Sequence, residues 1–278
     1  MSDLISAAEL AARSDEPGLR LLDVRWELGN DHTHDDYLSG HLPGAIFVDL
    51  DAELADLPAP ALGRHPLPSA ELFGAAVRRW GLHQGDTVVV YDGVGGVVAT
   101  RAWWLLRDAG FEDVRLLDGG IAAWQRAGGA LETGETAAPG DGDFAVEFGH
   151  LPRLSLEEVA SFARDHTLFD IRTPDRYRGE HEPVDPRAGH VPGAVSAPTG
   201  ANLDEQGLFR SPAELRARFE ALGAAPDAPV AAYCGSGVTA THTVFALTQA
   251  GFSPTLFPGS WSQWSNHREL PVATGDRP

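Results

Sequence analysis

A long internal repeat is the feature of this 278-residue chain that most constrains its fold. Four short segments each occur twice, in the same order and 140 to 149 residues apart. The pairs are LLDVR at 21–25 with LFDIR at 168–172, GHLPGA at 40–45 with GHVPGA at 189–194, VVYDG at 89–93 with AAYCG at 231–235, and LDGGIAAW at 117–124 with FPGSWSQW at 257–264. Four pairs in one register indicate a tandem duplication of a domain of about 130 residues.

The duplication predicts two domains joined by a linker. We expect an N-terminal domain over residues 1–130 and a C-terminal domain over residues 153–278. Residues 131–152 between them are rich in glycine, alanine, threonine and acidic side chains, and they lack a helical period, which is typical of a linker.

Each half alternates strand-like with helix-like segments. Short apolar runs at 20–24, 87–91 and 114–117 are typical of buried parallel strands. Apolar residues at helical spacing over 100–109 and 238–250 predict helices, and each of these segments is followed by a glycine. The alternation predicts an α/β fold with two mainly parallel sheets, each flanked by helices. Ligands of such sheets bind beyond the carboxyl ends of the strands.

The composition limits what such a protein can bind. The chain has one cysteine, no lysine and a net charge of −19. One cysteine cannot form an intrachain disulfide, and the N-terminal segment lacks the pattern of a signal peptide, so we expect a protein of the reducing cytoplasm. The acidic balance argues against nucleic acid and membrane as partners. It also requires local arginines or backbone amides to capture an anionic substrate.

The single cysteine, Cys234, lies where a strand-like run ends and a helix-like segment begins. The glycines at 235 and 237 allow the backbone N–H groups of this turn to converge on an anion, and the helix N-terminus adds positive potential. Both effects favour the thiolate, which is the nucleophilic form of cysteine. We therefore interpret Cys234 as a reactive group rather than as a buried structural thiol.

Taken together, these segments resemble the two-domain, or tandem, rhodanese-type sulfurtransferases over nearly the full chain. The loop sequence CGSGVTA at 234–240 is most similar to that of the 3-mercaptopyruvate sulfurtransferases. The resemblance implies that the Cys234 thiolate takes sulfane sulfur from a small anionic donor, 3-mercaptopyruvate, and becomes a persulfide. A thiol, thioredoxin or cyanide acceptor then removes the sulfur, and the reaction needs neither a metal nor another cofactor. The loop residues implied to hold the sulfur are Gly235, Gly237, Val238, Thr239 and Ala240.

The resemblance also assigns residues to donor binding. Arg176 and Arg187 match the two arginines that bind the donor's carboxylate and carbonyl, and Arg178 is the alternative to Arg176. Arginine suits this task because its planar fork can bind a carboxylate through two hydrogen bonds.

A proton-transfer group is implied beside the cysteine. Ser236 would pair with a histidine of the N-terminal domain, matched by His41, and help to protonate the leaving enolate of pyruvate. His190 occupies the equivalent turn of the second repeat and is interpreted as structural. The acidic partner of His41 is left open among Asp31, Asp35 and Asp36.

The repeat aligns Asp92 with Cys234, so the first domain is expected to be catalytically silent, because aspartate cannot carry sulfane sulfur. Three alternatives are kept for the whole chain. Thiosulfate could be the main donor on the same Cys234 persulfide. The chain could instead be a non-enzymatic rhodanese-like binding module. It could also be a phosphatase with a cysteine loop, although Ala240 stands where such a loop ends in arginine.

Overall fold

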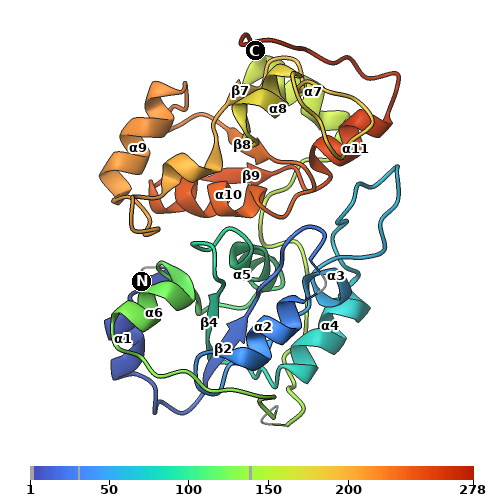
Figure 1. Cartoon of the computed structure of the whole chain (residues 1–278). Coiled ribbons are helices and arrows are strands. Elements are labelled where there is room, and N and C mark those ends of the chain that lie inside the picture. The colour runs from blue at the N-terminus through green and yellow to red at the C-terminus, as the bar shows by residue number, and fades with distance from the viewer. Residues whose placement is uncertain (1–2, 31, 138–139) are drawn as a thin grey trace. The chain divides into compact units, whose positions relative to one another are not determined.

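The computed structural model describes residues 3–30, 32–137 and 140–278 (Figure 1). The chain divides into two compact units. The first contains residues 1–56, 68–151 and 205–209, and the second contains residues 57–67, 152–204 and 210–278. Segment 57–67 therefore belongs to the second unit, although it precedes most of the first unit in the sequence. None of the described helices combines the length and apolar character needed to cross a bilayer.

The first unit is built on a five-stranded parallel sheet with the strand order β1-β5-β4-β2-β3. Figure 1 labels the neighbouring strands β2 and β4 of this sheet. The strands are β1 Leu4–Ile5, β2 Leu19–Asp23, β3 Ile46–Phe47, β4 Thr87–Tyr91 and β5 Val114–Leu117. β4 lies at the centre, and Val88, Val89 and Val90 have no exposed surface. A central parallel strand is covered on both faces, which explains its continuous run of β-branched residues.

Helices flank this sheet. They are α1 Ala7–Ala12, α2 Thr33–Ser39, α3 Leu50–Glu53, α4 Ala70–Arg79, α5 Ala99–Asp108 and α6 Gly120–Arg126. α5 packs on β4 and β5, while α6 packs on β5 and on α1. Ser6 begins α1 with a capping box, in which its side chain accepts from the Glu9 N–H and the Glu9 carboxylate accepts from the Ser6 N–H.

The second unit repeats this design on a four-stranded parallel sheet with the order β7-β6-β8-β9 (Figure 1). Its elements are α7 Leu156–Asp165, β6 Thr167–Asp170, α8 Pro174–Arg178, β7 Val195–Ser196, the 3₁₀ helix η1 Thr199–Asn202, α9 Pro212–Ala221, β8 Val230–Tyr233, α10 Ala240–Gln249, β9 Pro254–Leu256 and α11 Ser260–Asn266. α10 packs on β8 and β9, as α5 packs on the corresponding strands of the first unit. The predicted α/β architecture of two parallel sheets flanked by helices is confirmed.

A buried ion pair joins a strand end to the GHVPGA turn in the second unit. Arg172 donates from Nη2 to Asp170 Oδ2 and to the Gly189 carbonyl, each at 2.6 Å. The side chains are 2% and 0% exposed, and the Tyr233 hydroxyl also donates to Asp170 Oδ2 at 2.6 Å. Because the guanidinium binds both segments, the D-x-R sequence fixes where the turn lies against the sheet.

The first unit contains the same connection. Arg25 donates from Nη2 to Asp23 Oδ2 at 2.7 Å and to the Gly40 carbonyl at 2.6 Å. In both units the D-x-R segment thus contacts the G-H-x-P-G-A turn, and the sequence pattern alone does not show this contact.

We expect Asp170→Asn to destabilise the second unit by about 3 to 5 kcal/mol, because the substitution removes the closer of the two carboxylates that face the buried Arg172 charge. Urea unfolding followed by tryptophan fluorescence measures this effect. The matched control is Glu220→Gln, which breaks the exposed Arg216–Glu220 pair at 40% and 42% side-chain exposure. The control should change stability by less than about 0.5 kcal/mol, and equal effects of the two substitutions would contradict the structural role of the Asp170 pair.

Candidate active site

Cys234 lies at the end of β8, at the start of the turn that leads into α10. The residue is 3% exposed, and its Sγ accepts a hydrogen bond from the Gly237 N–H at 3.1 Å. Thr239 is the N-cap of α10, so the turn delivers the sulfur to a helix N-terminus. An N–H donor and a helix N-terminus both stabilise negative charge on sulfur.

Contacts with the segment after β9 hold this turn in place. Gly237 has a φ of 84°, and a Cβ added there would lie 2.0 Å from the Pro258 carbonyl oxygen, so only glycine fits. The Trp261 N–H donates to the Cys234 carbonyl at 3.0 Å, and the Ser262 N–H donates to the Gly235 carbonyl at 2.8 Å. In the second repeat, the third repeated segment, 231–235, therefore contacts the fourth, 257–264.

Ser260 is a site residue that the sequence analysis did not single out. Its hydroxyl oxygen accepts from the Cys234 N–H at 3.1 Å and lies 3.9 Å from Sγ. Ser260 has a φ of 53°, which is a strained backbone conformation for a residue other than glycine. The repeat offered a signal, because the aligned residue of the first unit is Gly120, with a φ of 56°.

The histidine beside Ser236 is His65. Its Nδ1 lies 2.8 Å from the Ser236 hydroxyl oxygen, and each residue is 8% exposed. His65 belongs to segment 57–67, which is part of the second unit. The sequence analysis missed this residue because the segment has no counterpart among the four repeated motifs.

The expected pairing of Ser236 with His41 is therefore wrong. His41 is fully buried, its Nδ1 lies 2.9 Å from the Leu42 carbonyl and its Nε2 lies 3.0 Å from the Gly134 carbonyl. Its ring stacks on Tyr37 at 4.1 Å. His190 is held in the same way in the second unit, by two carbonyls and a stacked tyrosine. Both histidines fix their turns.

Both ring nitrogens of His41 lie beside backbone carbonyls, so neither Asp35 nor Asp36 is its acidic partner. Asp31 lies outside the described residues. The Asp35 carboxylate lies 3.1 Å from His32 Nδ1 and is 71% exposed. Asp36 accepts from Arg25 through its backbone carbonyl at 3.0 Å.

Arg176 lies close to the cysteine turn. A Cβ built on Gly235 would be 3.5 Å from Arg176 Nη1. The guanidinium also donates to Glu182 Oε1 at 2.6 Å and to Asp185 Oδ2 at 3.3 Å. Arg178, the alternative to Arg176, pairs with Glu180 at 2.7 Å instead.

The structure places Arg187 in a different role from the predicted one. Its guanidinium donates to four backbone carbonyls that follow or end α11, at 2.7 to 2.8 Å. These carbonyls belong to Trp264, Ser265, His267 and Leu270. Four of its five N–H groups are thereby used, so Arg187 acts as a C-terminal cap of α11 and the assignment to donor binding is wrong.

A second arginine nevertheless reaches the cysteine turn. Arg64 precedes His65, and its Nη2 would lie 2.9 Å from a Cβ built on Gly235. Its Nη1 forms an ion pair with Asp185. Segment 57–67 therefore supplies an arginine beside Gly235 and a histidine beside Ser236.

Two carboxylates within this cluster have opposite pKa shifts. Burial raises the pKa of Asp185, and the nearby Glu182 charge adds to this effect against the pull of Arg64 and Arg176. Burial also acts on Glu182, but hydrogen bonds from Arg176 and from two backbone N–H groups outweigh it and lower the pKa of that carboxyl. Glu182 is therefore the firmer anionic partner of Arg176.

The corresponding turn of the first unit contains Asp92. One carboxylate oxygen accepts from Val94 and Gly96, and the other accepts from Val98 and Ala99, all through backbone N–H groups at 2.8 to 3.0 Å. The side chain is fully buried. The four N–H groups of this turn are thus satisfied internally.

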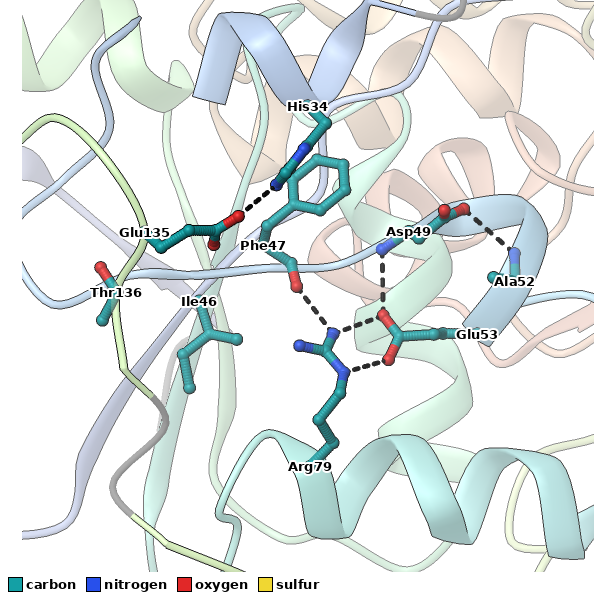
Figure 2. A pocket seen from close by; sticks show the side chains of 9 residues that line it. All are labelled: His34, Ile46, Phe47, Asp49, Ala52, Glu53, Arg79, Glu135 and Thr136. Carbon is teal, nitrogen blue, oxygen red and sulfur yellow. Dashed lines mark hydrogen bonds and ion pairs between the residues drawn. The ribbon is translucent and has the colours of Figure 1, made fainter. Parts of the chain in front are cut away.

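Figure 2 shows a pocket of the first unit whose polar side chains pair with one another. His34 points to Glu135 at 2.9 Å, and Arg79 contacts both oxygens of Glu53 at 2.6 Å and the Phe47 carbonyl at 2.8 Å. This pocket contains none of the predicted site residues.

Comparison with known proteins agrees with this arrangement. The sequence model of the rhodanese-like domain matches residues 6–127 and 155–267. The Mycobacterium tuberculosis protein SseB, provisionally named a thiosulfate sulfurtransferase, is 45% identical over 98% of this chain and 97% of its own length. A Pseudomonas aeruginosa protein provisionally named 3-mercaptopyruvate sulfurtransferase is 44% identical over 99% of both chains. The crystal structure of the Escherichia coli 3-mercaptopyruvate sulfurtransferase SseA matches with a TM-score of 0.83 and 34% identity, over 94% of this chain and 99% of that one.

We expect Arg187→Gln to destabilise the second unit by about 2 to 4 kcal/mol, because glutamine cannot satisfy four carbonyls at the end of α11. Thermal unfolding measures the loss. The folded fraction of the variant should bind the sulfur donor with an unchanged KM. A large rise in KM without a loss of stability would instead support the role predicted from the sequence.

Proposed function

The chain belongs to the rhodanese-like family, and from this premise we propose that it is a sulfurtransferase that moves sulfane sulfur from 3-mercaptopyruvate to a thiol or cyanide acceptor through a persulfide on Cys234. The observation that carries the proposal is the contact between the Gly237 N–H and Cys234 Sγ at 3.1 Å, within a turn that leads into a helix. A sulfur atom in this position can attack as a thiolate and can retain a negative charge after it has accepted a second sulfur.

The first half-reaction transfers sulfur to the enzyme. The Cys234 thiolate attacks the donor sulfur, an S–S bond forms, and the C–S bond breaks with its electron pair moving into the enolate of pyruvate. A proton equivalent to that of the donor thiol reaches the enolate carbon, which leaves pyruvate and a persulfide anion. The turn residues 235–240 are proposed to hold the anion through their N–H groups.

The second half-reaction returns the enzyme to its starting state. A nucleophilic acceptor, either a thiol, reduced thioredoxin or cyanide, attacks the outer sulfur, and the Cys234 thiolate leaves. With cyanide the product is thiocyanate. The chain has one cysteine, so an external acceptor must resolve the persulfide.

Ser236 and His65 are proposed to deliver the proton to the enolate. Their hydrogen bond of 2.8 Å links a hydroxyl beside the cysteine turn to an imidazole, the side chain that most often serves in general acid–base catalysis. The hydroxyl would donate to the leaving enolate, and His65 would replace its proton.

Thiosulfate is the second candidate donor, because the two most similar relatives reported above carry different donor names. It would use the same Cys234 persulfide with sulfite as the leaving group. The Ser236–His65 pair favours 3-mercaptopyruvate, since sulfite leaves without the carbon protonation that an enolate requires. A comparison of kcat/KM for the two donors decides between them.

The first unit is proposed to be catalytically silent, since Asp92 occupies the position of the nucleophile and already binds the N–H groups of its turn. We propose a cytoplasmic location, because a lone persulfide-forming cysteine is suited to a reducing compartment.

We expect incubation with 3-mercaptopyruvate to increase the intact mass of the protein by one sulfur atom, because the persulfide is a stable covalent intermediate until an acceptor arrives. Cyanide should remove the added mass. Cys234→Ser should neither gain mass nor transfer sulfur, and sulfur transfer by this variant would refute the mechanism.

We expect His65→Asn to lower kcat with 3-mercaptopyruvate by about 100-fold, because general acid catalysis is lost. The same variant should lose less than about threefold with thiosulfate, whose leaving group is stable as an anion. Steady-state kinetics with both donors tests this difference. His41→Asn is the control, and a donor-selective loss in this control rather than in His65→Asn would reverse the assignment.

A further inference from the structure

We propose that Ser262 is a positioning residue that holds His65 against Ser236. This inference rests on the proposed function, because it concerns the pair to which proton delivery is assigned. Ser262 lies in the first turn of α11 and has no exposed surface. Its backbone N–H and its hydroxyl bind two different segments, which are the cysteine turn and segment 57–67.

The backbone of Ser262 binds the cysteine turn. Its N–H donates to the Gly235 carbonyl at 2.8 Å, which fixes the peptide that leads into Ser236. The neighbouring Trp261 N–H donates to the Cys234 carbonyl at 3.0 Å. The first turn of α11 therefore holds both the cysteine and the serine through their backbone.

The side chain of Ser262 binds the segment that carries the histidine. Its hydroxyl oxygen accepts from the backbone N–H of Arg64 at 3.1 Å, and the hydroxyl donates to the Gly259 carbonyl at 3.1 Å. Arg64 directly precedes His65, whose Nδ1 lies 2.8 Å from the Ser236 hydroxyl oxygen. Together with the backbone bond to the cysteine turn, these contacts close a ring that begins and ends at Ser262.

Gly63 allows the segment to approach this turn of α11 closely. The residue has a φ of 99°, and a Cβ added there would lie 2.8 Å from the Gly259 carbonyl oxygen and 2.9 Å from Ser262 Oγ. The Ala61 carbonyl accepts from Gln263 Nε2 at 2.8 Å. Two consecutive side chains of α11 therefore bind the segment just before its histidine.

The tip of the segment gains little stability from apolar burial. Leu57 and Leu62 are 83% and 54% exposed, so their side chains contribute little burial to hold the backbone in place. The Arg64 guanidinium also pairs with Asp185. That ion pair lies at the end of a long side chain with several rotatable bonds, so it restrains the backbone less than a hydrogen bond to the backbone N–H does. We therefore assign the alignment of His65 mainly to the Ser262 hydroxyl.

Proton delivery depends on this alignment. A displacement of about 1 Å in a catalytic arrangement can lower a rate by about 100-fold. Without the Ser262 hydroxyl, the backbone N–H of Arg64 loses its acceptor, and His65 gains freedom to move away from Ser236. The backbone N–H of residue 262 still binds the cysteine turn, so the change should act on proton delivery rather than on the thiolate.

The ring signals of His65 in nuclear magnetic resonance spectra test the proposal without requiring sulfur transfer. In protein labelled with ¹⁵N-histidine, His65→Asn identifies these signals by their absence. We expect Ser262→Ala to shift them, because the hydrogen bond to Ser236 lengthens. Where Ser262→Ala does not fold, Gln263→Met takes its place, since it breaks only the bond to Ala61 and should shift the same signals.

We expect Ser262→Ala to lower kcat with 3-mercaptopyruvate by about tenfold, because proton delivery through His65 is impaired. In a His65→Asn background the same substitution should change kcat by less than about 1.5-fold, since a residue that acts through His65 then has nothing to position. A role in general stability would instead lower kcat in both backgrounds, and that result overturns the proposal.

Ser265→Ala is the matched control. It removes a hydroxyl from the same helix at 1% exposure, and this hydroxyl has no hydrogen-bond partner among the described residues. The control should leave the His65 signals and kcat unchanged. Unchanged His65 signals in Ser262→Ala, or equal effects of the two substitutions, overturn the proposal. If Ser262→Ala shifts the signals but the wild-type protein transfers no sulfur from 3-mercaptopyruvate, the proposed function is refuted and the positioning of His65 by Ser262 is supported.

Discussion

Each unit of this protein places a buried hydrogen-bond acceptor in the turn that leads into a helix. Backbone N–H groups must donate to this acceptor, because burying it without hydrogen bonds would cost free energy. In the first unit the acceptor is the Asp92 carboxylate, which receives four N–H groups. In the second it is the Cys234 sulfur, which receives the Gly237 N–H. The equivalent glycines Gly95 and Gly237 have φ values of 74° and 84°, so the two turns follow similar paths around different atoms.

The comparison of the two turns supports the proposal that one copy of the fold is reactive and the other is catalytically silent. A carboxylate has two oxygens, and those of Asp92 accept from four N–H groups of its turn, which are therefore already paired without a ligand. A single sulfur atom cannot occupy the same set of donors, so the turn of Cys234 retains capacity for a second sulfur atom. The proposal thus assigns different functions to two turns that differ in this one residue type, while α5 and α10 pack on corresponding strands.

The internal repeat predicts the fold, and it also indicates the structural role of His41. The strand and helix segments, the parallel sheets and the position of Cys234 followed from local patterns that the two halves share. The resemblance assigns His41 to catalysis, whereas its twin in the repeat, His190, is interpreted as structural. Equivalent residues in a repeat have equivalent surroundings unless one copy has diverged, and the structure shows both histidines in the same structural role.

The roles of Arg187, Arg64 and segment 57–67 depend on tertiary contacts, and the local sequence pattern does not predict them. Arg187 and Arg64 are both exposed-looking arginines in irregular segments, and nothing in their neighbouring residues distinguishes a helix cap from a group beside the cysteine. The role of each arginine depends on which backbone carbonyls lie near its guanidinium after α11 has formed. Segment 57–67 lies between α3 and α4 of the first unit in the sequence but belongs to the second unit. No periodicity or motif in the sequence indicates that it belongs there.

The arrangement of charge also revises the electrostatic argument that the composition suggested. A net charge of −19 and the absence of lysine implied that arginines near the cysteine provide an excess of positive charge. The three arginines Arg64, Arg172 and Arg176 instead face three carboxylates, those of Asp170, Glu182 and Asp185. The cluster is electrically balanced, so an anion is not attracted by net charge. In the proposed reaction an anion would instead be recognised through directional donors of the partly exposed guanidinium groups and through the N–H groups of the turn. A site of this kind discriminates by geometry, because an anion that cannot reach those donors gains nothing to offset the repulsion of the acidic surface.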